Sequence, residues 1–118
     1  MPRIEIERVY DWKPDGNGGR PVLVDRVWPR GKSKAALAGV EWLKAVAPSD
    51  ALRKWFGHKP ERWAEFRRRY FAELDSNPAL GRLRELAEDG PVTLLYGARD
   101  ETHNQAVALR DYLMGKRG

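Results

Sequence analysis

Residues 90–104, GPVTLLYGARDETHN, carry the strongest structural signal in the sequence. Their apolar run from Val92 to Tyr96 follows a Gly-Pro pair and ends at Gly97, which is typical of a strand that is covered on both faces. The polar residues that come next lead into an amphipathic helix. We therefore predict a strand-loop-helix unit. Because open α/β sheets bind ligands beyond the carboxyl ends of their strands, we expect the functional site at this loop.

Two further strands are predicted upstream of this unit. Residues 4–10 alternate apolar and polar side chains, whereas residues 21–28 begin apolar and end charged. Residues 40–46 fit a short strand and a helix equally well. Helices are expected after Ser49, from Pro60 to about Leu74, after Asn77, and after Asp100 or Thr102.

Strands that are separated by helices, with connections long enough for crossovers, imply a mostly parallel sheet. We therefore predict an α/β fold, a small three-layer domain in which such a sheet is flanked by helices. The length of 118 residues predicts that residues 1–118 form a single domain. Neither the strand order nor the oligomeric state follows from the sequence.

The composition favours a cytoplasmic protein with anionic partners. The chain contains no cysteine, which excludes disulfides and thiolate chemistry. No segment approaches the roughly 20 apolar residues of a membrane span, and the first residues do not resemble a signal peptide. The net charge is +5, from 22 Lys and Arg against 17 Asp and Glu, which favours nucleic acids, phosphates or carboxylates as partners. No glycine-rich nucleotide fingerprint is present, and no cofactor is expected.

Three motifs resemble those of a known family. They are VDRVWPRG at residues 24–31, APS with LRKWFGH at residues 47–49 and 52–58, and LLYGARD with HN at residues 94–100 and 103–104. These motifs are similar to the signatures of the YeaO-like branch of the domain of unknown function 488 family, over nearly the whole chain. The resemblance implies no particular substrate. Longer relatives have a cysteine-bearing loop after the last strand, so a thiol mechanism cannot transfer to this chain.

Three arginines at or just beyond strand ends are candidate ligands for an anion. Arg26 lies near the end of one predicted strand and Arg30 just beyond it, and Arg99 follows another strand. If these strands are neighbours, the guanidiniums converge near the N-terminus of the last helix, which suits a phosphate or a carboxylate. In the alternative, Arg26 and Arg99 pair with Asp25 and Asp100 and fasten loops together.

Asp25, Asp100 and His103 are the candidate catalytic residues. Two carboxylates in one cleft can be driven to different pKa values and then act as acid and base, or bind a metal. A helix N-terminus would keep His103 neutral and able to accept a proton. In the alternative, the aspartates cap turns and the histidine holds its loop. No second ligand lies at metal spacing from His103, and we expect no metal site.

The remaining candidate ligand-binding residues are Trp28, Arg53, His58, Tyr96 and Asn104. Aromatic side chains next to basic ones can wall a cleft or stack bases, and more often they fill a core. Asn104 would complete the site from the last helix, together with His103.

These patterns predict a protein that binds a small anionic ligand, bearing phosphate or carboxylate, at the carboxyl ends of its strands. If the protein is an enzyme, hydrolysis or group transfer by acid-base chemistry fits best. The alternative is a nucleic-acid-associated or regulatory binding domain that uses Arg53, Lys54, Arg67, Arg68 and Arg69. A third hypothesis is a scaffold whose charged strand ends are purely structural.

Overall fold

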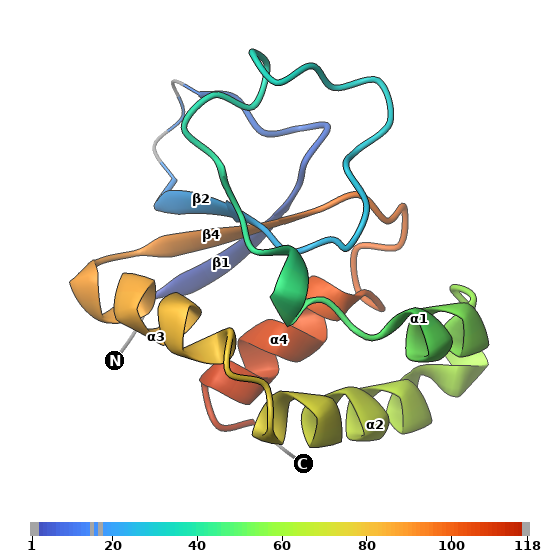
Figure 1. The fold of residues 1–118 in the computed structure, drawn as a ribbon. Helices are drawn as coiled ribbons and strands as arrows, with labels where there is room; N and C mark the ends of the chain where they lie inside the picture. The colour runs from blue at the N-terminus through green and yellow to red at the C-terminus, as the bar shows by residue number, and fades with distance from the viewer. Residues whose placement is uncertain (1–2, 15, 17, 117–118) are drawn as a thin grey trace.

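A computed structural model describes residues 3–14, 16 and 18–116 of the chain. Residues 1–2, 15, 17 and 117–118 of the predicted single domain lie outside this part. A four-stranded sheet has the order β1-β4-β2-β3, and each of its three ladders is parallel (Figure 1). The prediction of a small α/β domain with a parallel sheet is confirmed. The strands are β1 (Ile4–Arg8), β2 (Arg20–Leu23), β3 (Glu41–Trp42) and β4 (Val92–Tyr96).

Four α-helices and two short 3-10 helices complete the fold. Ser49 accepts a hydrogen bond from the amide of Leu52 and so caps α1, as predicted, and Gly57 ends this helix in a left-handed conformation. Asn104 caps α4, in place of Asp100 or Thr102, by accepting from the amide of Val107. The elements are η1 (Lys44–Val46), α1 (Asp50–Phe56), η2 (Pro60–Arg62), α2 (Trp63–Asp75), α3 (Leu80–Asp89) and α4 (Gln105–Leu113).

The two faces of the sheet are covered in different ways. Alternate residues of the strands, such as Val22 and Leu94, join the main core with the helices, which all lie below the sheet in Figure 1. The opposite face carries Leu23 and Leu95, which pack with Leu37 and with aromatic side chains of the loops. The layer opposite the helices therefore consists of the long connections after β1 and β2, which run above the sheet in the figure.

Strand β2 is shorter than the predicted residues 21–28. It ends at Leu23, and Val24 adds one more hydrogen bond to the carbonyl of Leu95. At Asp25 the chain leaves the sheet. The Asp25 carboxylate accepts a hydrogen bond from the Gly97 amide, just beyond the end of β4. Residues 40–46 form a two-residue strand followed by a 3-10 helix.

The Tyr70 hydroxyl joins α2 to the end of η1. Tyr70 is fully buried, and its hydroxyl donates to the carbonyl of Val46. Tyr70→Phe leaves this carbonyl without its donor, and we expect the free energy of unfolding to fall by about 1 to 2 kcal/mol in urea denaturation. The control is Tyr10→Phe, because Tyr10 is 38% exposed and water can replace its hydrogen bond to the Arg30 carbonyl. Equal losses in the two variants would contradict this prediction.

Candidate functional site

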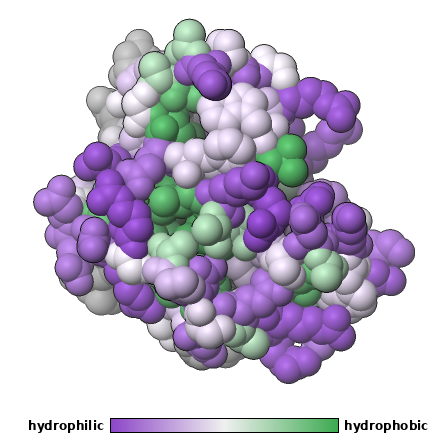
Figure 2. All heavy atoms as spheres, viewed as in Figure 1, coloured by the Kyte–Doolittle hydropathy of each residue, from purple (hydrophilic) through white to green (hydrophobic). Residues whose placement is uncertain are grey.

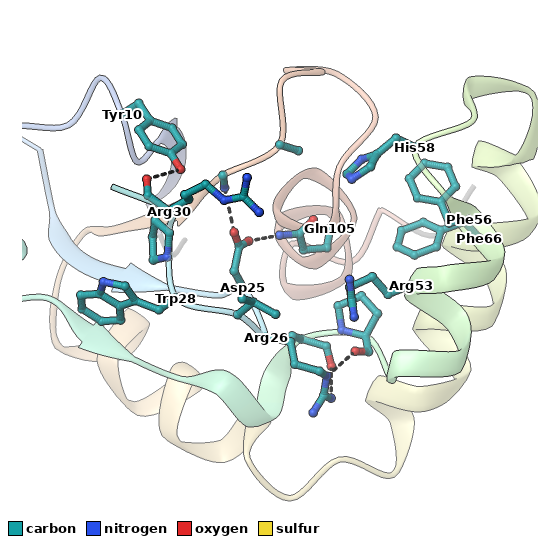
Figure 3. A pocket seen from close by; sticks show the side chains of 16 residues that line it. Tyr10, Asp25, Arg26, Trp28, Arg30, Arg53, Phe56, His58, Phe66 and Gln105 are labelled. Carbon is teal, nitrogen blue, oxygen red and sulfur yellow. Dashed lines mark hydrogen bonds between the residues drawn. The ribbon is translucent and has the colours of Figure 1, made fainter. Parts of the chain in front are cut away.

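A cleft of about 530 Å³ opens at the carboxyl ends of β2 and β4. Its floor comes from the residues just after these strands, Asp25 and Gly97, and from Gln105, the first residue of α4. One wall comes from α1 and α2, through Phe56 and Phe66. The other wall is the loop that follows β2 (Figure 3). This is the edge of the sheet at which the sequence predicts a ligand site.

The cleft brings together about half of the predicted site residues. They come from two distant parts of the sequence, the loop after β2 and the region of α1, and are Asp25, Arg26, Trp28, Arg30, Arg53 and His58. The lining therefore combines several cations with one carboxylate.

The other predicted residues lie outside the lining of this cleft. Tyr96 is buried, with 2% of its surface exposed, and is part of the main core. Arg99 is exposed. Asn104 is buried, and its side chain joins the Asp100 carbonyl to the Val107 amide.

Asp100 and His103 are tied to each other in the turn before α4. The Asp100 carboxylate accepts from the amides of Thr102 and His103, and these bonds, the Thr102 amide first, lower the pKa of Asp100 to about 2. Nδ1 of His103 lies 3.1 Å from Oδ2 of Asp100, and its ring packs edge-on against Trp63. These contacts agree with the alternative hypothesis, in which Asp100 caps a turn and His103 holds its loop.

Asp25 is held by neutral donors. Its Oδ2 accepts from the Gly97 amide at 2.9 Å, and its Oδ1 accepts from the side-chain amide of Gln105. Within the described part of the chain, no Lys, Arg or His nitrogen lies within 4 Å of this carboxylate. Burial raises the pKa of Asp25 to about 6, and the two hydrogen bonds offset this effect only in part.

Arg26 fastens a loop, but not through Asp25. Its Nε donates to the Pro48 carbonyl at 2.9 Å, and its Nη2 donates to the Ala47 carbonyl at 3.3 Å. The guanidinium also lies 3.7 Å from the Asp50 carboxylate. Arg26 thus holds the start of α1 against the end of β2, and two of its nitrogens donate to main-chain carbonyls.

Arg30 and Arg53 supply accessible cationic groups of the cleft, and His58 adds an exposed imidazole. The indole of Trp28 donates to the Lys32 carbonyl at 2.6 Å and closes the turn that presents Arg30. Arg53 extends from α1, with its Nη2 3.3 Å from the Asp50 carboxylate one turn earlier. His58 follows the end of α1 with a φ of 57°, a left-handed conformation that is uncommon outside glycine.

Several lining residues, four of them with large or polar side chains, were absent from the sequence-based candidates. Tyr10, Phe56, Phe66 and Gln105 all line the cleft. Gln105 directly follows a helix cap, so its place at the mouth of a strand-loop-helix unit could have suggested it. Phe56 follows basic residues in the sequence, and this pattern can indicate a cleft wall as well as a core. Phe66 has the spacing of an ordinary core residue, and Tyr10 depends on the path of a long loop, so the sequence contained no signal for these two.

Three of the arginines that a nucleic-acid-binding surface would use form ion pairs with carboxylates of the protein. Arg67 lies 3.3 Å from Asp111 on α4. Arg68 and Arg69 both bind Glu65 of their own helix, and their hydrogen bonds lower the pKa of Glu65 to about 2. These three arginines therefore do not form one face of unpaired charge.

The described residues lack two further features. They contain no group of three or more His, Asp or Glu side chains that could hold a metal ion. None of the helices in the described ranges is long and apolar enough to cross a membrane.

The comparison with known proteins gives a family and several relatives. Residues 3–117 match the family model DUF488-N3i, which is described as the inactive DUF488-N3 subclade. The chain is 45% identical over 111 residues to the uncharacterised protein YeaO of Escherichia coli, covering 93% of this chain and 96% of YeaO. It is 40% identical over 114 residues to the uncharacterised proteins Mb3100c of Mycobacterium bovis and Rv3073c of Mycobacterium tuberculosis, covering 97% of this chain and 96% of each relative. No solved structure matches the chain significantly.

Proposed function

The chain belongs to the DUF488 family, in the DUF488-N3 subclade described as inactive, and from this premise we propose that it is a binding protein for a small anion. The ligand carries a phosphate or a carboxylate and lies in the cleft at the carboxyl ends of β2 and β4. The single observation that carries this proposal is the convergence of Arg30, Arg53 and His58 on a cleft that contains one carboxylate.

Arg30 and Arg53 are available to bind an anion at the mouth of the cleft, because neither is held by a buried carboxylate in the part of the chain that the structure describes. Among residues 3–14, 16 and 18–116, no carboxylate lies within 4 Å of the Arg30 guanidinium. Among the described carboxylates, Arg53 pairs only with the exposed Asp50 of its own helix, and such an interaction is weak in water. Both guanidiniums can therefore turn toward a ligand and bind it through two parallel hydrogen bonds.

The apolar part of the lining supports a small molecule with a hydrophobic body. Phe56 and Phe66 are stacked with their ring centroids 4.2 Å apart, and both line the cleft. A volume of about 530 Å³ is in the usual range of small-molecule sites. On the face drawn in Figure 2, hydrophobic side chains lie in patches among hydrophilic ones.

Binding without turnover accounts for the separation of the predicted catalytic residues. Asp25 lines the cleft, whereas Asp100 and His103 bind each other in the turn before α4. An acid-base hydrolase or transferase would need its acid and base at the same bound molecule. The word "inactive" in the family description agrees with this reading.

Arg53→Ala is expected to weaken the binding of phenyl phosphate at least tenfold, because a charge-assisted hydrogen bond to the phosphate is lost. The affinity is measured by titration followed by NMR, with inorganic phosphate as a second probe. Lys54→Ala is a matched control, because it removes one positive charge from the next residue of α1, which does not line the cleft. We expect this control to change the affinity less than twofold.

Two results would overturn the proposal. In the first, both variants lose the same affinity, which would indicate attraction by the net charge rather than a site. In the second, neither probe binds the wild type at millimolar concentration. Binding that is confined to single-stranded oligonucleotides and falls steeply with salt would favour the nucleic-acid alternative.

A further inference from the structure

Asp25 is the one acidic side chain among the described residues that line the cleft. Each of its carboxylate oxygens accepts one hydrogen bond from a neutral protein group, Gly97 on one side and Gln105 on the other. An ionised carboxylate can accept about four hydrogen bonds, so it retains capacity for a donor from a ligand. Figure 3 shows Asp25 between Arg30 and Gln105, facing the same opening as Arg53 and His58.

This carboxylate is held in a fixed orientation by three elements. The Trp42 indole of β3 donates to the Asp25 carbonyl at 2.7 Å and fixes its main chain. A Cβ at position 97 would lie 3.0 Å from Oδ2 of Asp25, so the close approach to the end of β4 depends on a glycine. Gln105 holds the other oxygen from α4. A carboxylate held in this way is a built feature of the cleft, unlike a surface aspartate that turns in solvent.

A fixed negative charge opposes the binding of a molecule that is only an anion. None of the arginines around the cleft lies within 4 Å of Asp25 to neutralise it, within the residues that the structure describes. The carboxylate therefore favours molecules that place a hydrogen-bond donor next to it, and rejects those that place an apolar or negative group there. Discrimination of this kind is strong when a buried polar group would otherwise lose its partner.

We propose that the ligand is bifunctional, with an anionic group bound by Arg30 and Arg53 at the mouth and an ammonium or another hydrogen-bond donor bound by Asp25 at the floor. This inference rests on the proposed function and deepens it, because it names the chemical class of the ligand. A small zwitterion with an apolar body between its two charges is the simplest member of this class. In this arrangement the apolar body lies along the wall of the cleft that contains Phe56.

Two matched pairs of probes test this inference by titration followed by NMR at pH 8. The first pair is 4-(2-aminoethyl)phenyl phosphate and 4-ethylphenyl phosphate, and the second is 4-(aminomethyl)benzoate and 4-methylbenzoate. Within each pair the anionic group and the ring are the same, and only the ammonium is missing from the second member. In the pair whose spacing fits the cleft, we expect the zwitterion to bind roughly tenfold more tightly than its partner.

Two variants assign the preference to its side chain. Asp25→Asn keeps the shape of the residue, and we expect it to abolish the preference for the zwitterion. Arg53→Ala should weaken both members of the pair by the same factor and leave their ratio unchanged. The wild-type ratio decides the question even if a variant folds poorly.

Each remaining outcome has a definite meaning. Equal affinities within both pairs, or a preference that survives in Asp25→Asn, would overturn the inference and leave the anion site standing. Tighter binding of the molecules without an ammonium would overturn it as well. If none of the four probes shifts resonances of the cleft residues, both the bifunctional ligand and the anion site are wrong.

Discussion

Gly19→Ala is expected to lower the free energy of unfolding by about 2 to 4 kcal/mol, because its new methyl group would overlap the main chain at the start of β4. An ideal Cβ at position 19 would lie 2.4 Å from the carbonyl carbon and oxygen of Pro91 and 2.7 Å from the nitrogen of Val92. These are backbone atoms, so no change of rotamer relieves the overlap.

The hydrogen bonds around Gly19 explain why the two segments lie so close together. The Gly19 amide donates to Oγ1 of Thr93 at 3.1 Å, and the Arg20 amide donates to the Pro91 carbonyl at 2.8 Å. These bonds align the start of β2 with the start of β4. Separating the segments to admit a methyl group would weaken both bonds and disturb the register in which Arg20 faces Val92.

The measurement is denaturation in urea, with Gly81→Ala as the control. Gly81 lies in α3, and nothing lies within 4 Å of a Cβ built there, so alanine should stabilise the helix by up to about 1 kcal/mol. Opposite signs in the two variants are the expected result. A Gly19→Ala protein as stable as the wild type would mean that the two strands can separate at little cost.

Strand β4 could be predicted from the sequence, but the layer that covers one of its faces could not. The run from Val92 to Tyr96 is buried along its whole length, as its composition predicts. That composition does not say what covers each face. The loops that cover the face opposite the helices do so through scattered side chains, such as Trp12 and Leu37, which have no periodic pattern. The strand β3 is too short for any pattern to identify it.

The position of the site could be predicted better than its membership. Parallel strands end at the same edge of the sheet, so residues that follow two strands were expected to meet there, and Asp25 does contact Gly97. The residues before α4 were expected at the same place. Local hydrogen bonds instead hold Asp100 to Thr102 and His103. An aspartate two residues before a threonine is a common turn pattern, and this signal could have favoured the structural alternative.

Asp25→Asn is expected to raise the free energy of unfolding by about 2 to 3 kcal/mol at pH 7.5. Burial raises the pKa of the Asp25 carboxyl from its ordinary value of 3.8 to about 6. In the unfolded chain the carboxyl loses its proton near the ordinary value, so between the two values the native state binds more protons than the unfolded state. The stability of the wild type therefore falls as the pH rises from about 4 to about 6 and stays lower above that window.

An asparagine avoids this cost and can keep the hydrogen bonds. Its oxygen can accept from the Gly97 amide, and its nitrogen can donate to the side chain of Gln105 once that amide has turned over. The measurement is denaturation of both proteins in urea from pH 3.5 to pH 8. Their difference should be small at the lowest pH and largest above pH 6.5, and other titrating groups cancel because both proteins contain them.

A difference that is independent of pH would contradict this reading, because it would separate the stability change from the ionisation of Asp25.

The expected result also bears on function. If asparagine makes the protein more stable while abolishing the preference for a zwitterion, the carboxylate destabilises the folded state and at the same time selects the ligand. A side chain that lowers stability in this way is found where ligand binding, rather than folding, requires that residue. Asp25 would then be maintained for the molecule that it contacts in the cleft.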